Sequence, residues 1–208
     1  MVKRQATRAE RMRERLTQEA ARIMVEQGVK DFQLAKRKAA ERLGAPDTRN
    51  LPQNREIQAA VEDYQRLFGG AAQRNRLRTL REAALEAMRF FARFEPRLVG
   101  GVLDGTAGEF SDVHLHVFAD TPEELVLFLV ENDIPFDIDE RRFRFGESYV
   151  FQPVYRFAAG DARFDLTLFD RRGLRQAPNS HVDGQAMRRA GVAELERLLA
   201  DPPEPEAL

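Results

Sequence analysis

The sequence predicts an α+β protein in which an N-terminal helical half packs against a C-terminal mixed β-sheet with flanking helices. Between residues 7 and 94, apolar residues recur at the spacing of one helix face. Between residues 113 and 169, short segments alternate apolar and polar residues, as half-buried strands do. Pro96 separates the two patterns. We therefore expect a helical, basic region over 1–95, a sheet domain over 96–200 and a disordered, Pro- and Glu-rich tail over 201–208.

The composition excludes several classes of protein. The 208-residue chain contains no cysteine, which excludes disulfides and thiolate metal sites. No apolar run approaches the roughly 20 residues that span a bilayer. The N-terminus is basic but lacks the apolar stretch of a signal peptide. We therefore expect a soluble, cytoplasmic protein without a membrane partner.

Four helices are expected in the N-terminal half. Each has one apolar stripe, and breaks at glycine or proline separate the segments. Asp31 is in position to cap the second helix, which is rich in lysine and arginine. The expected helices span residues 7–27, 31–43, 53–68 and 72–94.

Charge is distributed unevenly along the chain. Residues 1–98 hold 22 Lys and Arg against 13 Asp and Glu, a net of +9, and the remainder holds 11 against 21, a net of −10. This asymmetry favours a nucleic-acid or protein partner for the basic helices, with Lys36, Arg37 and Lys38 as the candidate contacts. The alternative is an ordinary solvated helix surface, with the two halves attracting each other.

The C-terminal half is expected to alternate strands and helices. A short buried strand over 98–103 leads into a glycine-marked turn over 104–108, and a second strand follows. Thr121, Pro122 and two glutamates form a typical helix start. The expected elements after the turn are a strand over 113–118, a helix over 123–132, strands over 134–145, 149–157 and 163–169, and a helix over 185–199.

A row of metal-capable side chains lies on the strand at 113–118. Because side chains alternate along a strand, Asp112, His114 and His116 share one face, and the valines and leucine between them share the other. Asp165 lies on the polar face of a later strand and joins this row if the two strands pair with matching faces. A carboxylate in the middle of a strand needs a cation or a partner. That partner is either a metal ion or a nearby arginine such as Arg142, Arg156 or Arg163.

These residues resemble the nucleotidyltransferase superfamily, especially its minimal bacterial members. That family has Gly-Ser or Gly-Thr after a first strand, Ser-Asp-x-Asp on a second strand and a third acid on a later one. Gly105-Thr106, the run Ser111 to His114, and Asp165 follow this order, and the resemblance covers roughly residues 95–170.

The resemblance implies a nucleotidyltransferase-like fold and metal-dependent transfer of a nucleoside monophosphate, or nucleotide binding by a degenerate relative. It implies that Asp112, His114 and Asp165 are catalytic, and that these residues with His116 hold Mg²⁺ or Mn²⁺ and an NTP. Gly105, Thr106 and Ser111 would bind the phosphates. His114 stands where the family has its second acid.

Two further interpretations remain open from the residues themselves. One is a non-catalytic nucleic-acid- or protein-binding module that uses the basic N-terminal helices. The other is a transition-metal site, because His-x-His with an aspartate supplies the nitrogen and oxygen ligands that Zn²⁺ accepts. His181 lies in a later loop and is a candidate fourth ligand for such a site.

Overall fold

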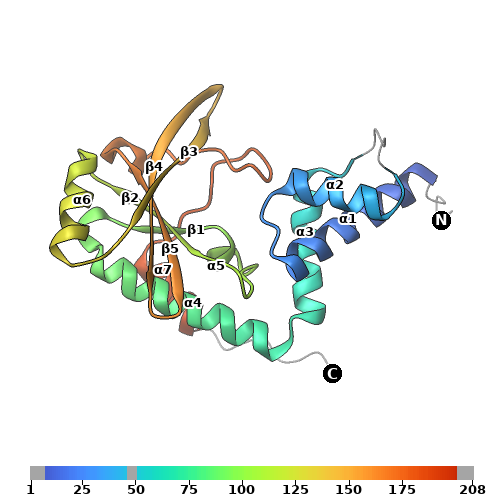
Figure 1. Cartoon of the computed structure of the whole chain (residues 1–208), viewed down its shortest axis with the longest axis horizontal. Helices are drawn as coiled ribbons and strands as arrows, with labels where there is room; N and C mark the ends of the chain where they lie inside the picture. The colour runs from blue at the N-terminus through green and yellow to red at the C-terminus, as the bar shows by residue number, and fades with distance from the viewer. Residues whose placement is uncertain (1–7, 46–50, 201–208) are drawn as a thin grey trace. The chain divides into compact units, whose positions relative to one another are not determined.

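The computed structural model describes residues 8–45 and 51–200 and has an α+β architecture (Figure 1). The expected tail over 201–208 lies outside the described residues. Helices occupy the N-terminal part of the chain, and a five-stranded mixed sheet with further helices follows. Within the described ranges, no helix is both long and apolar enough to cross a membrane.

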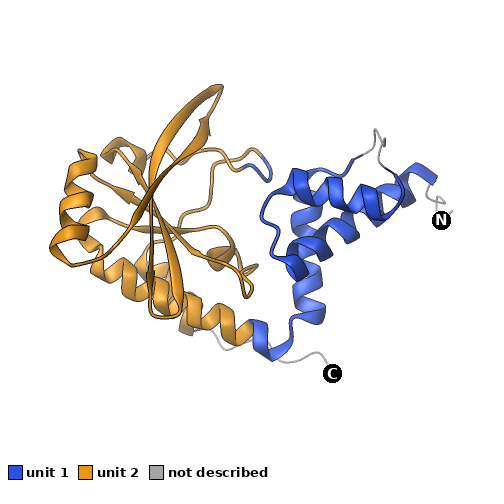
Figure 2. Ribbon diagram, in the orientation of Figure 1, with its two compact units in different colours: residues 1–73, 181–183 blue, residues 74–180, 184–208 orange. Residues whose placement is uncertain are grey.

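The chain forms two compact units (Figure 2). Unit 1 contains residues 1–73 and 181–183, and unit 2 contains residues 74–180 and 184–208. The boundary between the two compact units therefore falls after residue 73, earlier than the boundary expected at residue 95. The reason is helix α4 (Gly70–Phe90), whose buried Leu80, Ala84 and Met88 belong to the core of the sheet.

Unit 1 is built from three helices, α1 (Arg8–Gln27), α2 (Phe32–Arg42) and α3 (Asn54–Phe68). Their apolar stripes meet in one core, which includes Leu16, Ile23 and Ile57. The expected cap of α2 is confirmed, since the side chain of Asp31 accepts a hydrogen bond from the Leu34 amide at 2.6 Å.

Unit 2 contains the sheet, with strands in the order β1-β2-β5-β4-β3. Strands β2 and β5 are parallel, and every other neighbouring pair is antiparallel. Figure 1 shows β3 and β4 as a long hairpin. The strands are β1 (Arg97–Val99), β2 (Val113–Phe118), β3 (Asp137–Phe145), β4 (Ser148–Ala159) and β5 (Ala162–Phe169).

Shorter elements complete unit 2. The expected helix start at Thr121 is confirmed by its capping box. The helices are α5 (Gly101–Asp104), α6 (Pro122–Glu131) and α7 (Val192–Ala200), with 3-10 turns η1 (Ala92–Phe94) and η2 (Arg171–Leu174).

Two expected boundaries in unit 2 are wrong. The strand expected over 98–103 ends at Val99, because Gly100 adopts a φ of 69° and starts the short helix α5. The helix expected over 185–199 begins only at Val192. The preceding segment is a loop whose Asn179 bridges both to Arg144 at the edge of β3 and to Ala186.

The two faces of the sheet differ in character. Helices α4, α6 and α7 contribute to the large apolar core on one face, where Leu115 and Leu166 are fully buried. The other face carries the charged residues of β2, β5 and β4. A smaller cluster of Phe118, Phe143 and Phe169 adjoins them.

Candidate functional site on the charged face of the sheet

The strand pairing expected for Asp165 is confirmed. In the parallel pair of β2 and β5, His114 lies opposite Asp165, and His116 lies opposite Thr167. On the other face of β2, Val113, Leu115 and Val117 are fully buried in the apolar core. The polar row predicted from the alternation therefore exists, and Asp165 is part of it.

Asp165 is surrounded by cationic side chains. It is 3% exposed, and its carboxylate accepts two hydrogen bonds from Arg141, Nη1 to Oδ1 at 3.1 Å and Nη2 to Oδ2 at 2.6 Å. Arg156 Nε lies 3.6 Å from Oδ2, and His114 Nδ1 lies 3.4 Å from Oδ1. Burial alone would raise the pKa of Asp165, but the interactions with His114 and Arg141 outweigh it and hold the pKa well below its ordinary value of 3.8.

Asp112 is held separately from Asp165 by another arginine. Arg163 donates from Nε to Asp112 Oδ1 at 2.8 Å and from Nη2 to the Phe110 carbonyl at 3.2 Å. The arginine alternative from the sequence therefore applies to both aspartates, although Arg142, one of its candidates, lies over the ring of Tyr149 instead.

The residues of this row do not fit the metal centre that the resemblance implies. Two Mg²⁺ ions about 3.5–4 Å apart require several free carboxylate oxygens. Here both oxygens of Asp165 accept from Arg141, and an imidazole stands at position 114. Among the residues that the structure describes, no three acidic or histidine side chains are grouped to hold a metal ion.

His116 is a buried, hydrogen-bonded residue. It is 2% exposed, its Nδ1 accepts a hydrogen bond from Arg189 Nε at 3.0 Å, and its ring contacts Phe143 and Phe169. Burial, followed by the charge of Arg189, lowers the pKa of His116 well below 6.5. The imidazole is therefore neutral at pH 7, and its Nδ1 lone pair is engaged.

The expected phosphate-side residues lie in the loop between α5 and β2. Gly105 ends α5 with a φ of 86°, a left-handed conformation that favours glycine. Ser111 accepts a hydrogen bond from the Gly108 amide through its Oγ at 2.9 Å. The Oγ1 of Thr106 approaches Gly101 so closely that an added Cβ there would lie 3.1 Å from it.

His181 has its contacts in unit 1. Its ring lies 5.6 Å from that of Phe32 between centroids, and its carbonyl accepts from Asn54 Nδ2 at 2.7 Å. The candidate fourth ligand of a zinc site therefore belongs to unit 1, whereas Asp112, His114, His116 and Asp165 belong to unit 2.

The expected basic contact surface on α2 needs a correction. Lys36 is only 8% exposed and donates from Nζ to Asn54 Oδ1 at 2.7 Å, and burial lowers its pKa. The prediction that Lys36 contacts a partner is therefore wrong, because its side chain belongs to the interior of unit 1. Arg37 is exposed and Lys38 is partly exposed, and for these two the prediction remains open.

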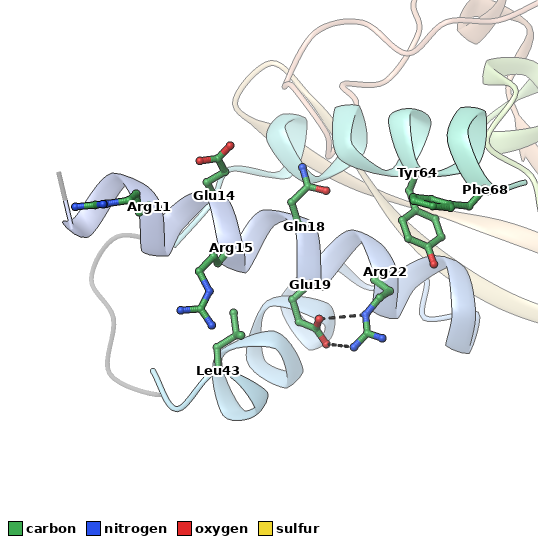
Figure 3. Close-up of a pocket in the computed structure, with 9 residues that line it drawn as sticks. All are labelled: Arg11, Glu14, Arg15, Gln18, Glu19, Arg22, Leu43, Tyr64 and Phe68. Carbon is green, nitrogen blue, oxygen red and sulfur yellow. Dashed lines mark hydrogen bonds and ion pairs between the residues drawn. The ribbon is translucent and has the colours of Figure 1, made fainter. Parts of the chain in front are cut away.

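Unit 1 also carries an open groove of about 610 Å³ (Figure 3). In it, Glu19 forms ion pairs with Arg22 and with Arg42. The phenol of Tyr64 donates to Glu26. The groove is lined by Arg11, Glu14, Arg15, Gln18, Glu19, Arg22, Leu43, Tyr64 and Phe68.

Two residues of the charged face were missed by the sequence interpretation, Arg141 and Arg189. Arg141 could have been found from the sequence, because on a strand it shares one face with Asp137 and Asp139, which precede it by four and two residues. Arg189 could not have been found in this way, since it lies in the segment over 185–199 that was expected to be a helix.

Comparison with protein families, curated proteins and solved structures found no match for this chain. Its chemistry is therefore inferred from the charged face itself.

Proposed function

We propose that unit 2 is a nucleotidyltransferase-like module that binds a nucleotide without carrying out metal-dependent transfer. The observation that supports this proposal is the pairing of Asp165 with Arg141 at the position where the family resemblance implies a metal ligand. A guanidinium group there supplies positive charge without a metal ion. The order of the turn, the strand with His114 and the strand with Asp165 agrees with the resemblance.

The charged face offers arginines suited to phosphate. The side chains of Arg141, Arg156 and Arg163 are 36%, 48% and 65% exposed, whereas the Asp165 side chain is only 4% exposed. The arginine side chains are therefore much more exposed to solvent than the carboxylate of Asp165. Because arginine binds phosphate oxygens through paired hydrogen bonds, a nucleotide would be held by its phosphates.

The test separates binding from transfer. The full chain is incubated with each of the four α-³²P-labelled NTPs, once in EDTA and once in Mn²⁺, and both retained label and covalently transferred label are measured. We expect retention of at least one nucleotide in EDTA and no transfer in either buffer. Retention should fall about tenfold or more in Arg141→Met, since a hydrogen bond to a charged group contributes about 1.5–3 kcal/mol.

Arg142→Met is the matched control, because Arg142 is the next residue and lies over Tyr149, away from Asp165. Its retention should equal that of the wild type. Mn²⁺-dependent transfer that disappears in Asp165→Asn would show an active enzyme and overturn the proposal. Failure to retain any of the four nucleotides would also overturn it.

A further inference from the structure

Two arginines flank His116, and neither has an acidic partner among the residues that the structure describes. Arg97 on β1 lies opposite His116 in the antiparallel pair, and Arg189 donates to the His116 imidazole from the loop before α7. Within residues 8–45 and 51–200, neither arginine forms an ion pair. In contrast, Arg141, Arg156 and Arg163 on the same sheet each pair with an aspartate.

The Arg189 guanidinium is fixed in an apolar setting. It lies 5.2 Å from the ring centroids of both Phe118 and Phe169, and its Nη1 donates to the Gly173 carbonyl. Its Nη2 is buried and has no hydrogen-bond partner among the described residues. Burial, and then the charge of Arg97, lower the pKa of Arg189 to about 10.

Arg97 keeps hydrogen-bonding capacity for a ligand. In the described part of the chain, only its Nη1 is engaged, by the backbone carbonyls of Glu95 and Pro96 at 2.9 and 3.1 Å. Its side chain is partly exposed, at the end of β1 that lies beside the carboxyl end of β2. Ligands of open α/β sheets bind at the carboxyl ends of parallel strands.

Arg189 is partly buried, and a cation that is partly removed from water without a counter-charge is costly; a second cation beside it adds to the cost. Within the described ranges, no nearby side chain supplies a counter-charge that removes this cost. His116 is held neutral, and Asp165, the acid whose charge acts on His116, is already paired with Arg141. Buried polar groups normally have partners, so the arrangement lacks an anion.

We propose that Arg97 and Arg189 form a binding site for a phosphate group. Two guanidinium groups match the charge of a phosphate dianion better than that of a single carboxylate, and both present the donor geometry that phosphate oxygens accept. The site uses residues other than Arg141 and goes beyond the proposed nucleotide binding on the same sheet.

The experiment is a calorimetric titration of the full chain with inorganic phosphate, and separately with acetate, at a constant ionic strength set with NaCl. We expect saturable binding of phosphate, with acetate binding at least tenfold more weakly. Arg97→Met should weaken phosphate binding about tenfold or more. Arg188→Met is the matched control and should bind as the wild type does, because Arg188 already pairs with Asp104 and Glu194.

Arg189→Lys provides a second variant beside Arg97→Met, at a position where a larger change could prevent folding. It keeps one positive charge but loses the guanidinium geometry, so phosphate binding should weaken while folding is retained. The proposal is overturned if the wild type shows no saturable phosphate binding, if acetate binds equally, or if Arg97→Met binds phosphate like the wild type. Loss of NTP retention with phosphate binding intact would refute only the proposed nucleotide binding.

Discussion

Removing Arg141 should destabilise unit 2 and leave a buried charge behind. In Arg141→Met, the methionine can still cover apolar surface, but Asp165 loses both of its short hydrogen bonds. The carboxylate side chain is 4% exposed, so water cannot replace the guanidinium group without a local rearrangement. The perturbation therefore tests whether Arg141 is the cation on which Asp165 depends.

The expected loss in the free energy of unfolding depends on the groups around Arg141 and Asp165. Breaking a buried ion pair by removing one partner costs about 3–5 kcal/mol. Here the cost is smaller, because the Arg141 side chain is 36% exposed and two other groups stay close to Asp165. His114 lies 3.4 Å away and Arg156 lies 3.6 Å away. We therefore expect a loss of about 2 kcal/mol in the free energy of unfolding of unit 2.

The assay is urea unfolding at pH 7, followed by the methyl NMR signals of Leu115 and Leu166. Both leucines are fully buried in the core of the sheet, so their signals report on unit 2 rather than on the whole chain. This choice matters because a chain with two units need not unfold in one step. The double variant Arg141→Met, Asp165→Asn should be more stable than Arg141→Met alone, since it contains no unpaired carboxylate.

The corresponding double-mutant cycle should give a coupling of about 2 kcal/mol between Arg141 and Asp165. Arg142→Met serves as the control and should change the free energy of unfolding by less than about 0.5 kcal/mol, as exposed substitutions usually do. A coupling near zero, or equal losses in Arg141→Met and Arg142→Met, would refute the reasoning.

Three other outcomes test separate parts of the fold. Because folding lowers the pKa of His116 below 6.5, the unfolded chain binds more protons at this residue than the folded chain does. The free energy of unfolding of unit 2 should therefore fall as the pH decreases from about 7 to 5. Thermal melts of the wild type and of His116→Gln should differ in this dependence on pH. Leu115→Ala should cost about 2–5 kcal/mol in urea unfolding, whereas Leu127→Ala, at a side chain 59% exposed, should cost little. Asp31→Ala should cost about 1 kcal/mol in the unfolding of unit 1, measured by its own methyl signals, and a loss close to zero would show that the cap of α2 contributes nothing.

The faces of the central strand could be predicted because they depend on a local rule. Side chains alternate along any strand, so the polar and apolar rows of β2 follow from the order of residues alone. The inward position of Lys36 also follows from a local pattern in the sequence. Phe32 precedes it by four residues, and Ala39 and Ala40 follow it at three and four, which is the spacing of one buried helix face. The composition of the helix suggested a basic surface, but its periodicity already indicated that one lysine points inward.

The partner of Asp165 could not be predicted in this way. Arg141 lies on β3 and Asp165 on β5, and β4 runs between them in the sheet. The contact therefore depends on the strand order, on the register of two hairpin pairs and on the length of an arginine side chain that reaches across β4. The sequence interpretation considered arginines nearby in the chain or on the neighbouring strands, and it named Arg156, which approaches to 3.6 Å, but not Arg141.

The balance of positive and negative side chains differs between two positions along β2. A carboxylate in the middle of a sheet requires a cation. From the sequence alone, this cation could equally be a metal ion or an arginine. With Arg141 as the cation, Asp165 is neutralised internally and does not need a ligand. The same reasoning applied two residues further along β2 gives the opposite result. There the cations Arg97 and Arg189 are present and the anion is missing. Internal charge therefore satisfies the carboxylate of Asp165 without a metal ion, whereas the two arginines beside His116 require an anion from solution.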